Sequence, residues 1–178
     1  NLRKFDKDMQ LIEVKNCVFR INRDVRFSKN KTPYKNNFAA SFKKQGKKSI
    51  FAGYYFHLQP GGESFSGGGL WTPEPQNLKK VRQEIDYCFA EFKKIVHSQS
   101  FRKQFGELGR EEGQVLVNIP KGYDKDNPAA EYLKLKSFFA SKDIADKELT
   151  ESGLMKTVIK SFEAFHPLLD FMNRALHE

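Results

Sequence analysis

Alternating apolar and polar positions predict β-strands in the first half of the chain. Residues 17–23 place Phe19 and Ile21 on one face and Arg20 and Asn22 on the other. Because side chains alternate across a strand, the apolar pair should face the core and the polar pair the opposite side of the sheet.

Three more strands are expected in the same half. A polar loop over 24–35 leads to a strand over 37–42, and the turn Pro60-Gly61-Gly62 separates strands over 50–59 and 65–71. Short connections of this kind join antiparallel neighbours, so the sheet should be mainly antiparallel.

The second half of the chain repeats apolar residues at three- and four-residue intervals, which is the period of a helix. One such stripe runs from 78 to 96 behind Pro75, and another runs from 154 to 165. We expect Pro167 to end or kink the second helix before a terminal helical segment.

Shorter elements are expected between the two stripes: a helix around Phe101, a strand over 115–119, a helix from Asn127-Pro128 to about Leu135, and a strand over 137–140. Strands early and helices late indicate an α+β fold, with a mainly antiparallel sheet from the N-terminal half packed against helices from the C-terminal half. At 178 residues, seventeen of them Phe, the chain should form a single domain over 1–178 with a Phe-rich core.

Cysteine usage and hydropathy narrow the class of protein. Cys17 and Cys88 lie in apolar stretches without the spacing of a zinc site or a disulfide framework, so we expect free thiols and a cytoplasmic protein. No apolar run reaches eighteen residues, so no membrane span is expected. No metal or organic cofactor is implied, and the oligomeric state is left open.

The net charge of +9 is concentrated near the N-terminus. Residues 1–50 hold fourteen Lys and Arg against four acids, whereas residues 51–178 hold seventeen against eighteen. Between Lys15 and Lys48 the only acid is Asp24, so this stretch should attract phosphates, carboxylates or nucleic acid. The alternative is a solvated basic face that serves solubility alone.

A long mixed motif covers the basic stretch, Arg20-Ile-Asn-Arg23-Asp24-Val-Arg26-Phe27-Ser-Lys-Asn30-Lys31-Thr-Pro-Tyr34. Together with the stretches at 53–61, 67–75 and 120–124, it resembles the bacterial family known as domain of unknown function 2461. The resemblance runs through nearly the whole chain and implies no particular activity. The family usually has a further region ahead of this motif, so we expect a missing N-terminal segment before Asn1.

The basic residues of this motif could form an anion cradle, because guanidinium groups bind phosphate and carboxylate in a fixed bidentate geometry. The cradle would comprise Arg20, Arg23, Arg26, Lys31 and Lys35. In the alternative, the arginines pin the loop to the sheet by pairing with acids such as Glu74, Glu84, Glu91 or Glu131.

A polar pocket would form beside the cradle if the strands over 17–23 and 50–59 were neighbours, because Tyr55, His57 and Gln59 would share a face with Arg20. His57 is the candidate for general acid/base work, with Tyr55 bordering the reacting group. The alternative is a histidine that is hydrogen-bonded in a half-buried sheet face.

Aromatic residues near the cations could stack on a base or sugar, as in single-strand nucleic-acid grooves, or could simply pack. They are Trp71, Tyr34 and Tyr123. Lys121-Gly122 could form an anion-binding turn or a plain one. The chain lacks G-x-x-x-x-G-K-[ST], G-x-S-x-G and H-E-x-x-H, and the bare backbone of 67–69 admits a chain segment, a bulge or a ligand.

Three hypotheses for function remain open. The first is binding or processing of a small phosphorylated anion at a basic pocket. Its contacts would come from the ligand-binding set Arg20, Arg23, Arg26, Lys31, Tyr34, Lys35, Gln59, Trp71 and Lys121. The second is a basic interaction module for nucleic acid or an acidic protein. In the third, the arginine cluster is purely structural.

Overall fold

The computed structural model describes residues 1–177 and places four strands in one antiparallel sheet. The strands are β1 (Phe38–Lys43), β2 (Gly53–Leu58), β3 (Ser64–Leu70) and β4 (Phe138–Ile144). Their order in the sheet follows their order in the chain. The predicted α+β class is confirmed, with three strands in the first half and β4 added as an edge strand after most of the helices.

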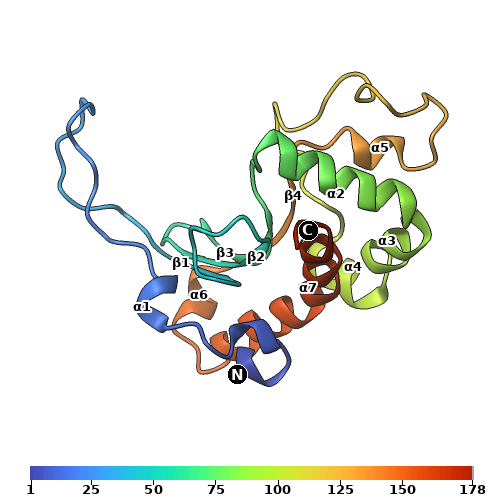
Figure 1. Cartoon of the computed structure of the whole chain (residues 1–178). Helices are drawn as coiled ribbons and strands as arrows, with labels where there is room; N and C mark the ends of the chain where they lie inside the picture. The colour runs from blue at the N-terminus through green and yellow to red at the C-terminus, as the bar shows by residue number, and fades with distance from the viewer. Residues whose placement is uncertain (178) are drawn as a thin grey trace.

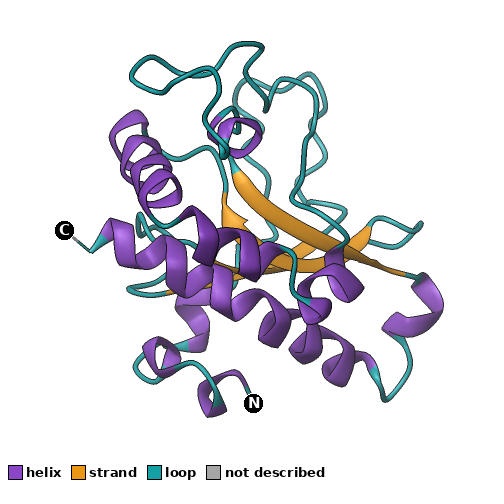
Figure 2. Cartoon of the chain, turned by 90° about the vertical axis from the view of Figure 1, so that its right-hand side faces the viewer, coloured by secondary structure: helices purple, strands orange, loops and turns teal. Residues whose placement is uncertain are grey.

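Helices make up most of the remaining chain. They are η1 (Leu2–Lys4), η2 (Lys7–Met9), α1 (Val14–Cys17), α2 (Pro75–Tyr87), α3 (Phe89–Val96), α4 (Gln99–Phe105), α5 (Ala130–Leu133), α6 (Asp146–Leu149) and α7 (Leu154–Leu176). Figure 2 shows the long helices gathered on one side of the sheet, whereas mostly loops reach the other side. This one-sided arrangement buries one sheet face and leaves the other to the connecting segments.

The core lies between the sheet and α7, and it is rich in phenylalanine as expected, with seven Phe side chains buried. Tyr54 of β2 is fully buried and its ring centroid lies 4.9 Å from that of Phe162. A Cβ added at Gly68 of β3 would lie 2.9 Å from the Phe165 ring. The bare backbone of the glycine run is therefore approached by another segment of the chain, one of the outcomes expected from the sequence.

A buried polar cluster fastens the N-terminal segment to this core. The Tyr54 hydroxyl lies 2.8 Å from Asp6 Oδ2 and 2.8 Å from His166 Nδ1, and Asp6 is only 2% exposed. His166 Nε2 lies 3.3 Å from Asp170 Oδ2. Because a buried carboxylate needs hydrogen-bond donors, the cluster ties η1 and η2 to β2 and α7.

The predicted strand over 17–23 is wrong. Its first residue ends α1, and beyond that the segment makes only isolated bridges, Val18 with Ala40 and Asn22 with Tyr34. Alternation sets a local preference, but a strand also needs a ladder of partners, and the chain leaves the edge of β1 after one bridge.

Other boundaries also differ from the sequence pattern. The helix expected through residue 96 breaks at Cys88 into α2 and α3, and the strand over 115–119 is reduced to a single bridge from Val115 to Leu135. The helix expected from Asn127 is only the single turn of α5. Pro167 neither ends nor divides α7, which runs through it because its apolar stripe stays packed on the sheet.

Candidate functional site

Residues 18–37 form an arm that stands away from the body of the molecule (Figure 1). Its two legs are held together by backbone hydrogen bonds from Arg23 N to Pro33 O at 2.9 Å and from Lys35 N to Ile21 O at 2.8 Å. The arm carries six Lys and Arg against one acid. Much of the excess positive charge of the chain is therefore concentrated on a projecting segment.

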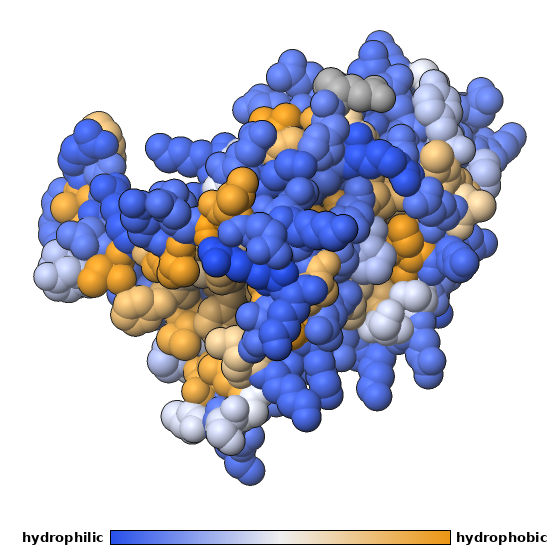
Figure 3. Space-filling view, turned by 60° about the horizontal axis from the view of Figure 1, so that its bottom comes forward, coloured by the Kyte–Doolittle hydropathy of each residue, from blue (hydrophilic) through white to orange (hydrophobic). Residues whose placement is uncertain are grey.

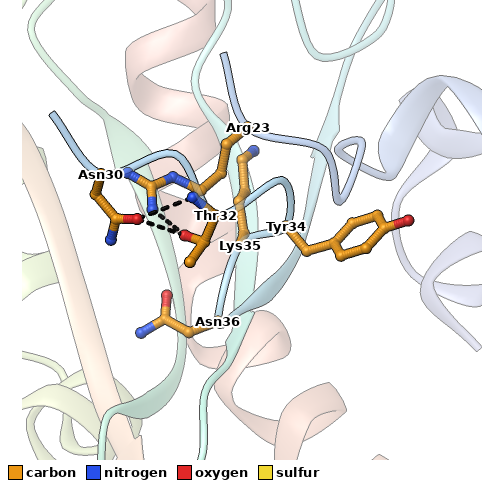
Figure 4. Close-up of a pocket in the computed structure, with 6 residues that line it drawn as sticks. All are labelled: Arg23, Asn30, Thr32, Tyr34, Lys35 and Asn36. Atoms are coloured by element: carbon orange, nitrogen blue, oxygen red, sulfur yellow. Dashed lines mark hydrogen bonds between the residues drawn. The ribbon is translucent and has the colours of Figure 1, made fainter. Parts of the chain in front are cut away.

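A cavity of about 450 Å³ lies in the arm and takes residues from both legs (Figure 4). It is lined by Arg23, Asn30, Thr32, Tyr34, Lys35 and Asn36. Figure 4 shows Arg23, Asn30 and Thr32 turned toward one another, whereas the Tyr34 ring points away from them. Two cations and no acid line this space, which we call the arm cavity, so its electrostatics favour an anion.

The Arg23 guanidinium is positioned by neutral groups. Its Nη1 donates to Thr32 Oγ1 at 2.7 Å and its Nη2 approaches Ser28 Oγ at 3.4 Å. The Thr32 hydroxyl in turn donates to Asn30 Oδ1 at 2.8 Å, which aims its oxygen at the arginine. Two of the five N–H donors of Arg23 are used in this way, so three are left for a ligand. In addition, no carboxylate within the arm pairs with the Arg23 charge.

Arg26 and Lys31 are engaged elsewhere in the arm and do not line the cavity. Arg26 holds Asp24 in a bidentate pair, with Nε to Oδ1 at 3.0 Å and Nη2 to Oδ2 at 2.7 Å. These bonds, with a smaller contribution from the charge of Arg20, lower the pKa of the Asp24 carboxyl. Lys31 Nζ donates to Val25 O at 2.9 Å. Of the arginines in the motif, only Arg23 lines the cavity.

The glutamates considered as partners of the arm are not paired with it. Glu84 and Glu91 both bind Arg174, at 2.7 and 2.9 Å, and Glu131 binds Lys134 at 2.9 Å. Across residues 1–177 no ion pair joins the arm to any of the four glutamates. The arm is therefore not pinned to the body in the way that the structural alternative required.

His57 and Tyr55 lie on β2, and Gln59 follows that strand, so none of the three reaches the arm cavity. The His57 ring stacks on Phe65 at 5.0 Å and on Tyr55 at 6.2 Å. His57 Nε2 lies 3.2 Å from Gln59 Oε1, and its Nδ1 is buried without a hydrogen-bond partner in residues 1–177. The imidazole is held in an aromatic stack on the sheet.

The polar pocket expected beside Arg20 is not formed. Because residues 17–23 are not a strand, the shared face with His57 does not exist, and the ring of Phe19 rather than Arg20 lies near Tyr55, at 6.3 Å. Burial raises the pKa of the Tyr55 hydroxyl. Besides the ring contact of Phe19 with Tyr55, a hydrogen bond of 3.3 Å from Asn37 Nδ2 to Gln59 Oε1 joins this region to the arm.

The remaining residues singled out in the sequence are separate from the arm cavity. Trp71 is 51% exposed and packs edge-on against Phe139 at 4.8 Å. Lys121 is exposed in the predicted turn, and Tyr123 packs against the core. The lining of the arm cavity does not include Trp71, Lys121 or Tyr123. It does include Tyr34, which is 59% exposed on the arm.

Neutral residues of the cavity were missed in the sequence. Asn30 Oδ1 accepts from Thr32 N at 2.9 Å, which makes an Asx turn, and Asn36 contributes another amide to the lining. The sequence did contain a pattern that predicts this turn, because an Asn two residues before a Thr in a polar loop is typical of Asx turns. Only the folded arm shows that this turn orients Arg23.

Apolar residues also reach the surface near these cations. Figure 3 shows the arm protruding from a mostly hydrophilic surface, with hydrophobic residues both on it and on the neighbouring part of the body. Phe27 of the arm is 96% exposed, and Leu11 and Val14 beside η2 are 94% and 72% exposed. The arm therefore offers stacking surface as well as charge.

The structure also bears on metal and thiol chemistry. Both cysteines are free, Cys17 buried and Cys88 half-buried, and burial raises the pKa of the Cys17 thiol. Over residues 1–177, no group of three His, Cys, Asp or Glu is arranged to hold a metal ion. None of the helices described between these limits is long and apolar enough to cross a membrane.

Comparison with known families places the chain. A family model described as "Conserved hypothetical protein (DUF2461)" matches residues 1–171. The chain therefore belongs to this family, as the resemblance of its sequence indicated. The family description carries no activity, so function has to be argued from the geometry of this protein.

A relative from Ciona intestinalis, an "ATP-dependent (S)-NAD(P)H-hydrate dehydratase", is 31% identical over 105 residues. The match covers 57% of this chain but only 27% of the relative, so the chain spans about a quarter of that protein's length. No solved structure matches the chain significantly.

Proposed function

We propose that the arm cavity binds a small phosphorylated anion, with Arg23 and Lys35 as its charged contacts. The observation that carries this proposal is the placement of Arg23, which lines a cavity without an acid and is held only by the hydroxyls of Thr32 and Ser28. A guanidinium with free donors is suited to a phosphate, because its planar fork matches two phosphate oxygens at once.

The size and lining of the cavity agree with this ligand class. A volume of about 450 Å³ lies within the range of small-molecule sites, which is roughly 300 to 1,000 Å³. Lys35 adds a compact positive charge, and the amides of Asn30 and Asn36 add neutral donors that can fix orientation. The proposal is one of binding, since His57 and Tyr55 lie outside this cavity.

The Ciona relative gives separate support for the ligand class. Its name contains two phosphorylated compounds, ATP and NAD(P)H. Because this chain spans about a quarter of that protein, its dehydratase activity is not carried over. What the likeness supports is a phosphorylated ligand.

Calorimetric titration with magnesium-free ATP and, separately, with inorganic phosphate tests the proposal. Arg23→Ala should weaken binding by about 10- to 100-fold, the loss of one charge-assisted contact of about 1.5–3 kcal/mol. Arg26→Ala is the matched control, because it removes the same charge from the same arm but its guanidinium is bound to Asp24. The control should lose no more than about threefold, or roughly 0.6 kcal/mol.

Equal losses in the two variants would contradict a pocket built on Arg23. If neither ATP nor inorganic phosphate bound the unchanged protein, the proposal of a phosphorylated ligand would be wrong. Circular dichroism of each variant is needed alongside, since Arg23→Ala also removes the bond to Thr32 that shapes the arm.

A second candidate is an interaction module in which the whole arm docks on single-stranded nucleic acid. The exposed rings of Phe27 and Tyr34 beside six cations favour it, because bases stack on aromatic side chains in such sites. Binding of an oligonucleotide should then fall steeply with salt. Arg26→Ala and Arg23→Ala should weaken it equally, which separates this candidate from the cavity.

A further inference from the structure

A second cavity, of about 170 Å³, lies where α3, α4 and α5 meet, on the opposite side of the molecule from the arm (Figure 1). It is lined by Val96, His97, Arg102, Gly106, Glu107, Leu108, Arg110 and Tyr132. Its polar groups come from three elements and the loop after α4, so we call it the α3–α5 cavity. Val96 belongs to the apolar stripe expected from the sequence, but none of the polar residues of this cavity was proposed as a site residue.

A chain of hydrogen bonds fixes the proton positions at this site. Arg102 Nη2 lies 3.0 Å from His97 Nδ1, and His97 Nε2 lies 3.0 Å from the Tyr132 hydroxyl oxygen. Because a guanidinium can only donate, Nδ1 must be the acceptor, and the neutral imidazole carries its proton on Nε2. His97 therefore donates to the oxygen of Tyr132.

This leaves the hydroxyl hydrogen of Tyr132 available to a ligand. The oxygen already accepts from His97, and no group among residues 1–177 accepts the proton of the hydroxyl. Burial raises the pKa of Tyr132, with opposing effects from Arg110 and Glu107, so the phenol stays protonated. A donor chain that begins at a guanidinium polarises each following bond, so this O–H is a strengthened donor.

The charges around the cavity favour an anion by a small margin. Arg102 and Arg110 face a single lining acid, Glu107. Arg110 also approaches Glu131 at 3.7 Å, but that carboxylate is bound more closely by Lys134, at 2.9 Å. Arg110 is therefore only partly compensated and keeps donors for another acceptor.

We propose that the α3–α5 cavity is a binding site for a small oxyanion, a short carboxylate or inorganic phosphate, held by the Tyr132 hydroxyl and the guanidinium of Arg110. Its volume corresponds to roughly five or six water molecules, which admits such an ion but not a nucleotide. The site is independent of the arm cavity and does not rest on the function proposed for it.

Heteronuclear NMR of the whole chain, with histidine labelled in its ring nitrogens, tests the site. The free protein should show His97 as the neutral Nε2–H tautomer. Titration with sodium acetate and, separately, with inorganic phosphate should move the His97 ring signals to saturation, and the tighter of the two identifies the preferred head group.

Two variants test the contacts. Arg110→Gln and Tyr132→Phe should each lower the affinity for the ion by about tenfold or more. The phenylalanine of the second variant keeps the edge-on packing of the ring against Phe92 at 5.0 Å. Tyr87→Phe is the matched control, because Tyr87 is 78% exposed on α2 and does not line the cavity. The Tyr87→Phe protein should bind the ion with the affinity of the unchanged protein.

The proposal is overturned if neither ion gives a saturable shift at His97, or if both variants bind as tightly as the control. The same experiments distinguish failure of this proposal from failure of the one made for the arm cavity. Arg23→Ala should leave the His97 titration unchanged, and ligand at the arm is read from the amide signal of Thr32 instead.

Discussion

Removal of the Tyr54 hydroxyl should destabilise the fold without disturbing its packing. In Tyr54→Phe the ring keeps its place 4.9 Å from Phe162, but Asp6 loses a donor at 2.8 Å and His166 Nδ1 loses its contact with the hydroxyl at 2.8 Å. Asp6 is 2% exposed, so water cannot readily replace the lost donor. The backbone N–H of Asp8 still donates to Asp6 Oδ1, and the nearest group to Oδ2 is then His166 Nδ1, at 3.8 Å.

The magnitude follows from these contacts. A hydrogen bond to a charged group contributes about 1.5–3 kcal/mol, and a buried carboxylate left short of donors adds part of its desolvation cost. We expect the free energy of unfolding to fall by about 2–4 kcal/mol. For a chain of this size each kcal/mol lowers the melting temperature by about 2–4 °C.

Urea unfolding followed by circular dichroism measures this loss, with an unchanged m-value as the sign that the unfolded state is the same. Tyr87→Phe is the control, since its hydroxyl lies on a side chain that is 78% exposed. A Tyr54→Phe protein within about 0.5 kcal/mol of the unchanged chain would refute the view that this cluster holds the N-terminal segment in place.

Three further outcomes are expected from the same structure. Burial, with the charge of Asp6, raises the pKa of Tyr54 well above its ordinary value of 10.0, so the folded state keeps a proton that the unfolded state loses. This contribution to stability is complete below about pH 10 and declines as the pH rises further. Urea titrations at several alkaline pH values should show a steeper decline in the unchanged protein than in Tyr54→Phe, where the raised pKa values of Tyr55 and Tyr132 leave a smaller decline. Gly68→Ala should cost about 1–3 kcal/mol in the same unfolding assay, because its Cβ would lie 2.8 Å from the backbone oxygen of Gly53 and 2.9 Å from the Phe165 ring. An unaltered midpoint would contradict that packing. His57→Gln should leave the affinity of the arm for phosphate, measured by calorimetry, unchanged, because His57 does not line that cavity. A large loss of affinity would mean that the sheet face around His57 takes part in the site.

Local patterns predicted most of the secondary structure. The apolar stripe of 154–165 became α7, and the alternation around Tyr55 became β2. Where the pattern misled, the deciding contact was distant: residues 17–23 alternate like a strand, but only one bridge with β1 is available to them. A strand is defined by its partners, and partners are not encoded in alternation.

For the candidate sites, residue type was easier to foresee than residue role. The motif pointed to three arginines, and only the folded arm shows that Arg26 is bound by Asp24 whereas Arg23 faces a cavity. His97 and Tyr132 could not be associated in advance, because thirty-five positions separate them and neither belongs to a recognisable motif.

The sequence by itself determined the α+β class, the Phe-rich core, the family and the concentration of positive charge near the N-terminus, because periodicity, composition and motif are properties of neighbouring residues. Only the tertiary structure decided which charges are compensated and which hydroxyls keep a free proton. Those properties depend on groups such as Asp6 and Tyr54, forty-eight residues apart in the chain, that folding alone brings within 2.8 Å.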